Sequence, residues 1–403
     1  MVSDILTTLD PQLLGARLQE ARKASGLTQD AVAASMEMAR TTIVAIEKGE
    51  RRLTPHELIK LAGLYGVSVS RLIGRPQQVE ALVPQFRAAW KPDAELEACA
   101  SELQKVAEDY YELERLCDRP LARNYPNVYE FDDGTPDQAG EEIAQRERHR
   151  LGLGDGPVQD LGKILESDVG LRVFRLALPS KVAGLFAYND TLGGCIAVNG
   201  NHPGERANWS LAHEFGHFLT TRYQSEVTFL FADRPSSRKE RFAEAFAKYF
   251  LMPSSGLNRR FMEVYRANQR RMSLADILNL ADLFRVSVQA MVLRLEELQR
   301  LPAGTWDRLA MEGFKPRQAQ RVLGISHASG QVMRLPRRYT FLVGLAYWSE
   351  KITEGQAARF LRIDRVSARA VLDEIHKRSE VAPGNDDLAD LDLRLSEELV
   401  SPQ

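Results

Sequence analysis

Apolar residues recur at helical spacing from residue 11 to residue 75, interrupted at short intervals by capping and helix-breaking residues. Gly26 ends the first apolar run, Thr28 is placed to cap the second, and Gly49 ends a third run from Ala39 to Lys48. The pattern predicts five short helices. The second and third are joined by a tight turn, which is the helix-turn-helix arrangement.

A longer apolar pattern follows between Asp93 and Cys117, where spacings of three and four alternate over three heptads. The apolar positions are Leu96, Cys99, Leu103, Val106, Tyr110, Leu113 and Cys117. They predict either a coiled coil or a helix packed along its length within the chain. Pro76, Pro84 and Pro92 mark the boundary before this helix.

The pattern changes to alternation in three short stretches, at residues 171–176, 184–188 and 194–199, which predicts strands. A long apolar helix follows around residue 215, and residues 238–251 repeat apolar side chains at helical spacing. The fold class expected is therefore mainly α with a small β-sheet. We divide the chain into a helix-turn-helix domain (8–75), a helical linker (76–136), an α+β domain (137–300) and a helical C-terminal region (301–403).

Composition indicates how many domains, which partners and which cellular compartment to expect. The 403 residues suffice for two or three domains, and the net charge of −2 gives the whole protein no bulk attraction to nucleic acid, so DNA binding must be local. Three cysteines without metal-type spacing indicate a reducing compartment. Without a signal peptide or a membrane-length apolar run, we expect a cytoplasmic protein with no membrane partner.

The apolar helix around residue 215 contains His213-Glu214-Phe215-Gly216-His217, an H-E-x-x-H sequence. Histidines four residues apart share one helix face and can hold one Zn²⁺ ion, while Glu214 can act as the base toward a water molecule. A chance pairing of packed histidines is the alternative. Two of only seven histidines fall in this turn, which favours the zinc site.

A hydrolytic zinc site needs a third protein ligand and leaves one position open. Glu240 and Glu244 lie one turn apart on the downstream helix. One carboxylate can bind the metal while the other orients a ligand histidine. We favour Glu240 as the ligand. The alternative for both is a solvated acidic edge paired with Arg238 and Arg241.

Together these stretches resemble the ImmA/IrrE metallopeptidase family, from about Gln138 to Leu298. The resemblance is carried by Cys195-Ile196-Ala197-Val198-Asn199, the H-E-x-x-H helix, and the downstream helix ending in Leu251-Met252-Pro253. It implies a zinc endopeptidase that acts on DNA-binding repressors. Glu244 stands where the family usually has Asn or Asp, which keeps the choice between the two glutamates open.

The N-terminal helices resemble the XRE family of helix-turn-helix regulators through Leu27-Thr28-Gln29 and Ile46-Glu47-Lys48-Gly49. The resemblance implies binding to a double-stranded DNA operator, which we expect to occur as a homodimer. Carried over by position, the residues facing DNA would be Gln29, Arg40, Thr41, Thr42, Arg51 and Arg52. A protein-interaction module on the same scaffold is the alternative.

We therefore expect a DNA-binding transcriptional regulator whose gated zinc endopeptidase domain cleaves a repressor-type protein or its own chain. The irregular segment Asn124 to Thr135 is the expected self-cleavage site. Tyr188, His202 and Tyr223 are candidates for stabilising the oxyanion. The alternatives are a non-proteolytic regulator whose metal domain senses zinc or a ligand, and a peptidase whose helix-turn-helix binds protein.

The remaining sequence is helical. Residues 341–379 include Thr353-Glu354-Gly355-Gln356-Ala357-Ala358-Arg359-Phe360-Leu361, which has helix-turn-helix character without clear indication of DNA contact. Residues 385–398 form an acidic tail with regularly placed leucines.

Overall fold

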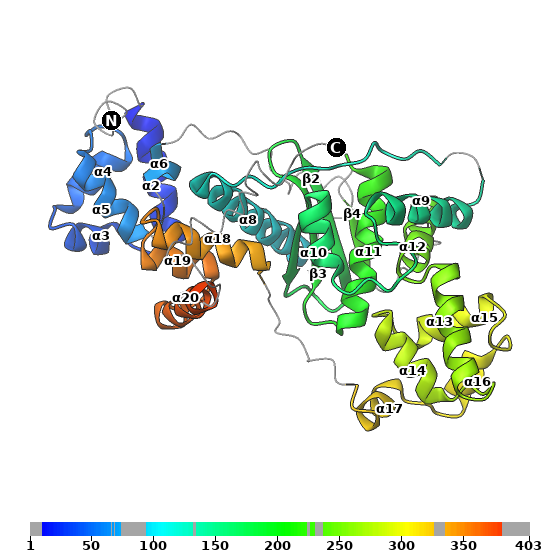
Figure 1. The fold of residues 1–403 in the computed structure, drawn as a ribbon. Helices are drawn as coiled ribbons and strands as arrows, with labels where there is room; N and C mark the ends of the chain where they lie inside the picture. The colour runs from blue at the N-terminus through cyan, green and yellow to red at the C-terminus, as the bar shows by residue number, and fades with distance from the viewer. Residues whose placement is uncertain are drawn as a thin grey trace, which may run out of the picture. The chain divides into compact units, whose positions relative to one another are not determined.

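The computed structural model describes residues 10–65, 67, 69–73, 94–131, 134–223, 226–229, 237–325 and 335–380. The chain forms two compact units (Figure 1). The first contains residues 1–79, 112–119 and 337–403, and the second contains residues 80–111 and 120–336. The proline-marked boundary at residues 76–92 and the acidic tail lie outside the described residues.

The N-terminal part of the first unit folds as the predicted set of short helices: α2 (Pro11–Ala24), α3 (Gln29–Ser35), α4 (Arg40–Glu47), α5 (Pro55–Tyr65) and α6 (Val69–Ile73). Their apolar faces form one core, in which Leu58, Val32 and Ile43 are at most 1% exposed. The Thr28 hydroxyl caps α3 by accepting from the Ala31 amide, as predicted.

A buried ion pair joins α2 to α4 beneath the helix-turn-helix. Arg22 donates to Glu47 through Nε at 2.6 Å and Nη2 at 3.1 Å. Gln29 at the start of α3 donates to the same carboxylate at 2.9 Å. The three side chains therefore tie α2, α3 and α4 together through one buried carboxylate, and Arg22 also donates to the Leu27 carbonyl at 2.8 Å.

The same unit contains three C-terminal helices, α18 (Arg337–Trp348), α19 (Glu354–Leu361) and α20 (Arg365–Glu380). Thr353 forms a capping box with Gln356 at the start of α19, and Tyr339 of α18 donates to the Phe360 carbonyl at 2.9 Å. Arg362 has a left-handed backbone conformation, with φ of 57°, and separates α19 from α20.

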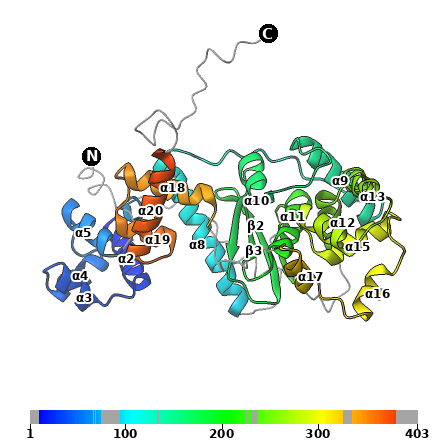
Figure 2. The same ribbon diagram turned by 60° about the horizontal axis from the view of Figure 1, so that its bottom comes forward.

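The second unit is built on a four-stranded sheet in the order β1-β3-β2-β4. Figure 2 shows two of its strands, β2 and β3. β1 (Arg172–Leu176) pairs parallel with β3 (Gly193–Asn199), and β2 (Val182–Asn189) pairs antiparallel with both β3 and β4 (Glu226–Phe229). The three predicted strands are confirmed. β4 was not predicted, and it covers the edge of β2 that would otherwise be open.

The heptad positions of α8 (Ala94–Cys117) are all buried within this single chain. In the second unit, Tyr110 packs edge-on against Phe174 of β1 and donates to Glu166 at 2.7 Å. In the first unit, the Cys117 thiol lies 3.5 Å from the Leu342 carbonyl. The seam therefore follows the second of the two expectations, packing along its length within the chain.

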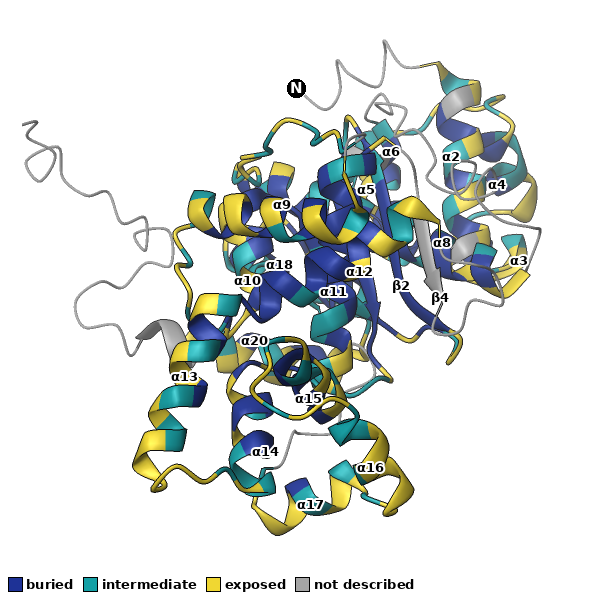
Figure 3. Cartoon of the chain, turned by 90° about the vertical axis from the view of Figure 1, so that its right-hand side faces the viewer, coloured by how far each residue is buried: buried dark blue, intermediate teal, exposed yellow. Residues whose placement is uncertain are grey.

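Two helices carry the residues of the candidate site. α11 (Gly204–Thr221) lies against β2 and β3, and α12 (Arg238–Leu251) packs between α11 and α9 (Pro136–Arg150). β2 is almost entirely buried, and so is α11 from Ser210 to Leu219 (Figure 3). The remaining helices of this unit are α10 (Leu161–Ile164) with the π-helical turn Leu165–Val169, α13 (Ser254–Ala267), α14 (Leu274–Leu283), α15 (Val288–Glu297), α16 (Thr305–Met311) and α17 (Pro316–Val322).

The described part of the connector between α8 and α9 is held against the peptide backbone of its unit. The Asn124 amide donates to the Val169 carbonyl at 3.0 Å, and the Tyr129 amide donates to the Leu219 carbonyl at 2.9 Å. Phe131 stacks on the ring of Phe242 with centroids 4.4 Å apart. The described part of this segment is therefore an ordered connector, and residues 132 and 133 lie outside the described residues.

No helix among the described residues combines the length and the apolar character needed to cross a bilayer.

Candidate functional site

The candidate site lies where α11 and α12 approach each other closely. A Cβ at Gly216 would come within 3.2 Å of the Ala243 Cα and within 3.3 Å of the Phe246 ring. The absence of a side chain at position 216 therefore lets α12 approach α11 beside the second histidine. This is the physical role of the glycine inside the H-E-x-x-H sequence.

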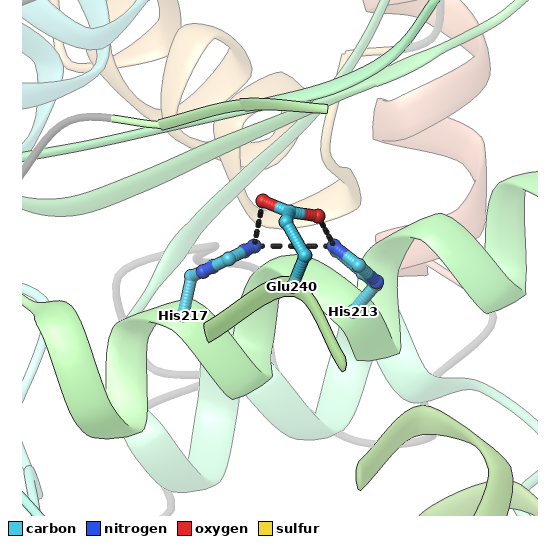
Figure 4. Close-up of side chains that lie close together, drawn as sticks. All are labelled: His213, His217 and Glu240. Carbon is cyan, nitrogen blue, oxygen red and sulfur yellow. Dashed lines mark hydrogen bonds and ion pairs between the residues drawn. The ribbon is translucent and has the colours of Figure 1, made fainter. Parts of the chain in front are cut away.

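Three side chains converge at this crossing (Figure 4). The Nε2 atoms of His213 and His217 are 3.1 Å apart. Glu240 of α12 places Oε2 3.3 Å from Nε2 of His213 and Oε1 3.3 Å from Nε2 of His217. His213 and His217 are buried, and the Glu240 side chain is about one-third exposed, so the cluster opens toward solvent on the carboxylate side.

The spacing of these atoms fits a tetrahedral metal ion. Ligand atoms bound to zinc at about 2.0–2.1 Å in tetrahedral geometry lie about 3.3 Å from one another. The 3.1 Å between the two imidazole nitrogens is close to that separation, and each nitrogen has a different oxygen of the Glu240 carboxylate 3.3 Å away. Two imidazoles and one carboxylate are also a donor set that zinc takes in hydrolytic sites. These residues could therefore hold a zinc ion.

Glu244 contacts the other nitrogen of the first histidine. Its carboxylate lies 3.4 Å from Nδ1 of His213 and accepts from the Trp209 indole at 3.2 Å. The structure thus separates the two glutamates: Glu240 lies among the ring nitrogens that face each other, whereas Glu244 lies behind one ring, where it can fix the orientation of that ring.

The electrostatics of the cluster favour a positive charge within it. Burial disfavours the charged imidazole of His213, but its contacts with Glu240 and Glu244 outweigh burial and raise the pKa of His213 to about 10. For Glu240, burial also opposes ionisation, yet the contacts with both histidines hold its pKa below the usual value. A proton or a metal cation can supply the positive charge that this arrangement stabilises.

Glu214 faces the sheet. Its side chain is fully buried, and a Cβ at Gly184 of β2 would collide with its carboxylate oxygen Oε1. The glycine therefore makes the space that the carboxylate occupies between α11 and β2. Glu214 is next to His213 in the chain, so its carboxylate lies on the strand side of the candidate site.

A cavity of about 1180 Å³ opens at the cluster, with His213, Glu240 and Glu244 among its lining residues. Helix α15 contributes Arg294 and Glu297 to its wall. The cavity is large enough for several residues of an extended peptide, because binding sites for whole drug-sized ligands span about 300–1,000 Å³.

None of the three oxyanion candidates lines this cavity. Tyr188 donates to Asp190 at 3.2 Å and packs edge-on against Tyr223, with ring centroids 5.4 Å apart. The His202 ring contacts the Ser180 carbonyl at 3.3 Å. In the part of the chain that the structure describes, the contacts of these three side chains therefore lie outside the cavity.

Two buried arginines that the sequence analysis did not identify hold the end of α12. Arg148 of α9 donates to the Phe250 carbonyl, and Arg294 of α15 donates to the Met252 carbonyl at 3.4 Å and to Ser254 at 2.7 Å. They satisfy carbonyls that a helix terminus leaves without partners. The sequence around each arginine is that of an ordinary charged helix. Their bonds to the end of α12 therefore become visible only in the tertiary fold.

Some of the residues expected to face DNA are exposed, and others are partly buried or already bonded within the domain. Arg40 and Thr41 lie exposed in the first turn of α4, and Arg40 is 3.6 Å from Asp30. Arg52 is exposed, whereas Arg51 pairs with Glu57 at 2.8 Å. Thr42 is partly buried, and the Gln29 amide is already bonded to the buried carboxylate of the α2–α4 ion pair. The first turn of α4 thus presents the most accessible polar groups.

Comparison with known proteins gives two matches to family models. Residues 166–296 match a peptidase family model described as an IrrE N-terminal-like domain, and residues 18–72 match a helix-turn-helix model. No curated protein matches the chain. A solved structure, the crystal structure of ComR from Streptococcus suis, aligns over 93% of this chain and 96% of its own at 10% identity, with a TM-score of 0.16.

Proposed function

Since the chain joins an XRE-type helix-turn-helix domain to an IrrE-like peptidase domain, we propose that it is a DNA-binding transcriptional regulator with a zinc-dependent endopeptidase activity. The observation that carries the enzymatic part is the convergence of His213, His217 and Glu240 with separations of 3.1–3.3 Å. His213, His217 and Glu240 would hold the metal.

When bound, zinc supplies Lewis acidity to a substrate carbonyl and lowers the pKa of water toward 7. The buried carboxylate of Glu214 takes the proton from the attacking water and returns it to the leaving amine. Glu244, which accepts from the Trp209 indole, holds the His213 ring in place. The cavity, which Ala183 of β2 helps to line, accepts the substrate.

The test compares wild-type protein with Glu214→Gln, which keeps the side-chain size and removes the base. Both proteins should contain about one zinc per chain, and cleavage of peptide-library substrates should fall by about 10²–10⁴-fold in the variant. Equal, low cleavage in both proteins with full zinc content would instead support a regulator whose metal domain senses zinc or a ligand.

We propose that the activity is gated by β4. Extended substrates commonly add a strand to an exposed sheet edge, and β2 is the strand that lies against Glu214. β4 pairs with that edge, with Thr228 opposite Gly184 and Val227 opposite Leu185. While β4 is paired, a substrate cannot add to β2 at this position. Displacement of β4 by a partner or substrate would open the site.

Val227→Pro tests the gate, because proline removes an amide donor and is poorly tolerated within a paired strand. Cleavage of library peptides should increase in the variant, and zinc content should stay the same. Val264→Ala on α13, distant in sequence from the strand, serves as a control for loss of a valine. Unchanged or reduced cleavage in Val227→Pro would refute gating by β4 and leave the zinc site itself unaffected.

The regulatory part of the proposal places a double-stranded DNA operator on the first turn of α4, with Arg40 and Thr41 contacting bases and Arg52 contacting phosphate. Helix-turn-helix proteins commonly bind paired half-sites as homodimers, which we propose here. For substrates, we favour a separate repressor-type protein over self-cleavage at Asn124–Thr135. The backbone of that segment is already bonded to its own unit at Asn124 and Tyr129.

A further inference from the structure

The C-terminal helices α19 and α20 repeat the local structure of α3 and α4. Thr28 and Thr353 each cap the first helix by accepting from the amide three residues later. A left-handed residue follows nine positions after each cap, at Glu37 and at Arg362. The second helix begins three positions later in both, at Arg40 and, 325 residues further along the chain, at Arg365.

The turn hydrogen bonds are also equivalent. The Met38 amide donates to the Ala33 carbonyl at 2.9 Å, and at the same offset the Ile363 amide donates to the Ala358 carbonyl at 3.2 Å. The adjacent bond, from the left-handed residue back into the first helix, is present in both turns. Each turn therefore directs its second helix from the first by the same backbone path.

The buried positions agree as well. The equivalent residues that are buried in both motifs are Val32 and Ala357, Ala33 and Ala358, Met36 and Leu361, Ile43 and Ala368, and Glu47 and Leu372. Small side chains replace larger ones in the second motif, and Leu372 replaces the charged Glu47. The second motif thus builds the same helix pair around an apolar contact where the first uses an ion pair.

The first turn of α20 exposes the positions that face outward on α4. Arg365 and Ser367 are exposed, and Val366 is 80% exposed. Asp30, the acid beside Arg40, is replaced by Gly355, where a Cβ would lie 3.1 Å from the Arg365 guanidinium. Arg365 makes no ion pair with any described residue. Arg365 therefore lacks the equivalent of Asp30, while Asp364, next to it in the chain, caps the helix by accepting from the Val366 and Ser367 amides.

We propose that α19 and α20 form a second helix-turn-helix that binds double-stranded DNA, with Arg365 and Val366 reading base edges in the major groove. An arginine can bond guanine and an apolar side chain can contact the thymine methyl group. The N-terminal residues of a recognition helix make the base contacts, and here they carry the exposed cation. The proposal rests on the proposed DNA binding by α3 and α4, since the two motifs share their geometry.

The charges that follow the first turn of α20 favour approach to DNA through the N-terminal end of this helix. Arg369 is held by Glu354 of α19 with donor–acceptor distances of 2.8–3.3 Å. Asp373 and Glu374 follow as exposed acids, which phosphates would repel. The first turn of α20 is therefore the part that is suited to approach DNA.

The experiment selects duplexes from a random-sequence library with the full-length protein, using duplexes long enough for several half-sites. The selected operator is then bound by wild-type protein and by four variants: Arg365→Ala/Val366→Ala, Val366→Glu, Arg40→Ala/Thr41→Ala, and Arg321→Ala as a control for an exposed arginine on α17. We expect the Arg365→Ala/Val366→Ala double variant and Val366→Glu each to weaken binding about tenfold or more and to lose protection of one sequence element.

The variants separate the two motifs. An element whose protection survives Arg40→Ala/Thr41→Ala but disappears in Arg365→Ala/Val366→Ala supports the second motif even if the first does not bind DNA. Wild-type affinity and an unchanged footprint in both α20 variants would overturn the proposal, and would fit a surface for a protein partner. Equal melting temperatures for the exposed α20 variants and wild type confirm that the fold is retained.

Discussion

Two buried groups of polar side chains lie at helix crossings in this protein, one in each unit. Below the helix-turn-helix, Arg22 and Gln29 direct their donors at the Glu47 carboxylate. In the peptidase domain, His213 and His217 direct ring nitrogens at one another and at Glu240. The first group contains its own permanent cation. The second consists of two weak bases and an acid.

The difference separates a structural cluster from a ligand site. Guanidinium is protonated at every accessible pH, so the Arg22–Glu47 pair is complete without any added group. Two imidazoles, which bind a metal in their neutral form, and a carboxylate converge within 3.3 Å, and this set of acceptors is completed by a proton or a metal cation. Burial and close packing alone do not distinguish the two; the balance of donors and acceptors does.

The largest expected effect is loss of metal from the second cluster. His213→Ala together with His217→Ala removes two of three ligands, so zinc content should fall from about one per chain to none. Elemental analysis of dialysed protein measures this. His149→Ala together with His202→Ala, which removes two histidines outside the cluster, should keep full zinc. Full occupancy in the His213/His217 variant would place the metal elsewhere.

The first cluster should respond as a structural one. Glu47→Gln leaves the Arg22 guanidinium buried without its counter-ion, which should destabilise the helix-turn-helix by about 3–5 kcal/mol. Hydrogen exchange in peptides from α2 to α4 reports this locally, and zinc content should stay at the wild-type value. Glu50→Gln, at an exposed position just after α4, is the matched control. Normal protection in Glu47→Gln would mean that apolar packing alone holds these helices.

The two clusters should respond to acid at different pH values. Burial opposes ionisation of Glu47, but its bonds from Arg22 and Gln29 outweigh this and lower its pKa. A folded-state pKa below the unfolded value of about 4.3 means that the stabilisation is present above that pH and is lost as pH falls through the folded pKa. Zinc should leave at a higher pH than the one at which the helix-turn-helix unfolds, because protons compete for the histidine ligands at higher pH than for carboxylates. Loss of both in one transition would contradict this order.

Much of this arrangement was predictable because it depends on local pattern. The short helices up to Ile73, the strands at 172–176 and 193–199, and the shared helix face of His213 and His217 follow from periodicity, capping residues and glycines. Sequence spacing also placed Glu240 and Glu244 on one face. Spacing could not say which of them reaches the histidine nitrogens, since that depends on where α12 crosses α11.

The features that were missed depend on contacts between distant segments. The stretch Glu226–Phe229 is too short to predict as a strand until β2 offers an edge for pairing. The heptad positions of α8 look the same whether their partner is a second chain or this one, and only the fold identifies it as intramolecular. Arg148 and Arg294 acquire their capping role from the end of α12, more than 40 residues away in sequence for each.

The smallest expected effect concerns the glutamate behind the first histidine. Glu244 touches Nδ1 of His213 at 3.4 Å, whereas Glu240 lies among the facing nitrogens. Removing a carboxylate that only orients a ligand commonly costs about 10–100-fold in metal affinity. Glu244→Ala should therefore still bind one zinc at high metal concentration, but with affinity reduced by that factor, and Glu240→Ala should lose more.

Competition titration against a chelator of known affinity measures the two variants on one scale, with Glu142→Ala on the exposed face of α9 as the control for loss of a glutamate. A greater loss in Glu244→Ala than in Glu240→Ala would exchange the two roles. That result would require the His213 ring to bind metal through Nδ1, the nitrogen that faces Glu244. Equal losses would indicate that both carboxylates bind the ion, which would make the cluster more negative than the three-ligand arrangement and shift its preference toward harder cations.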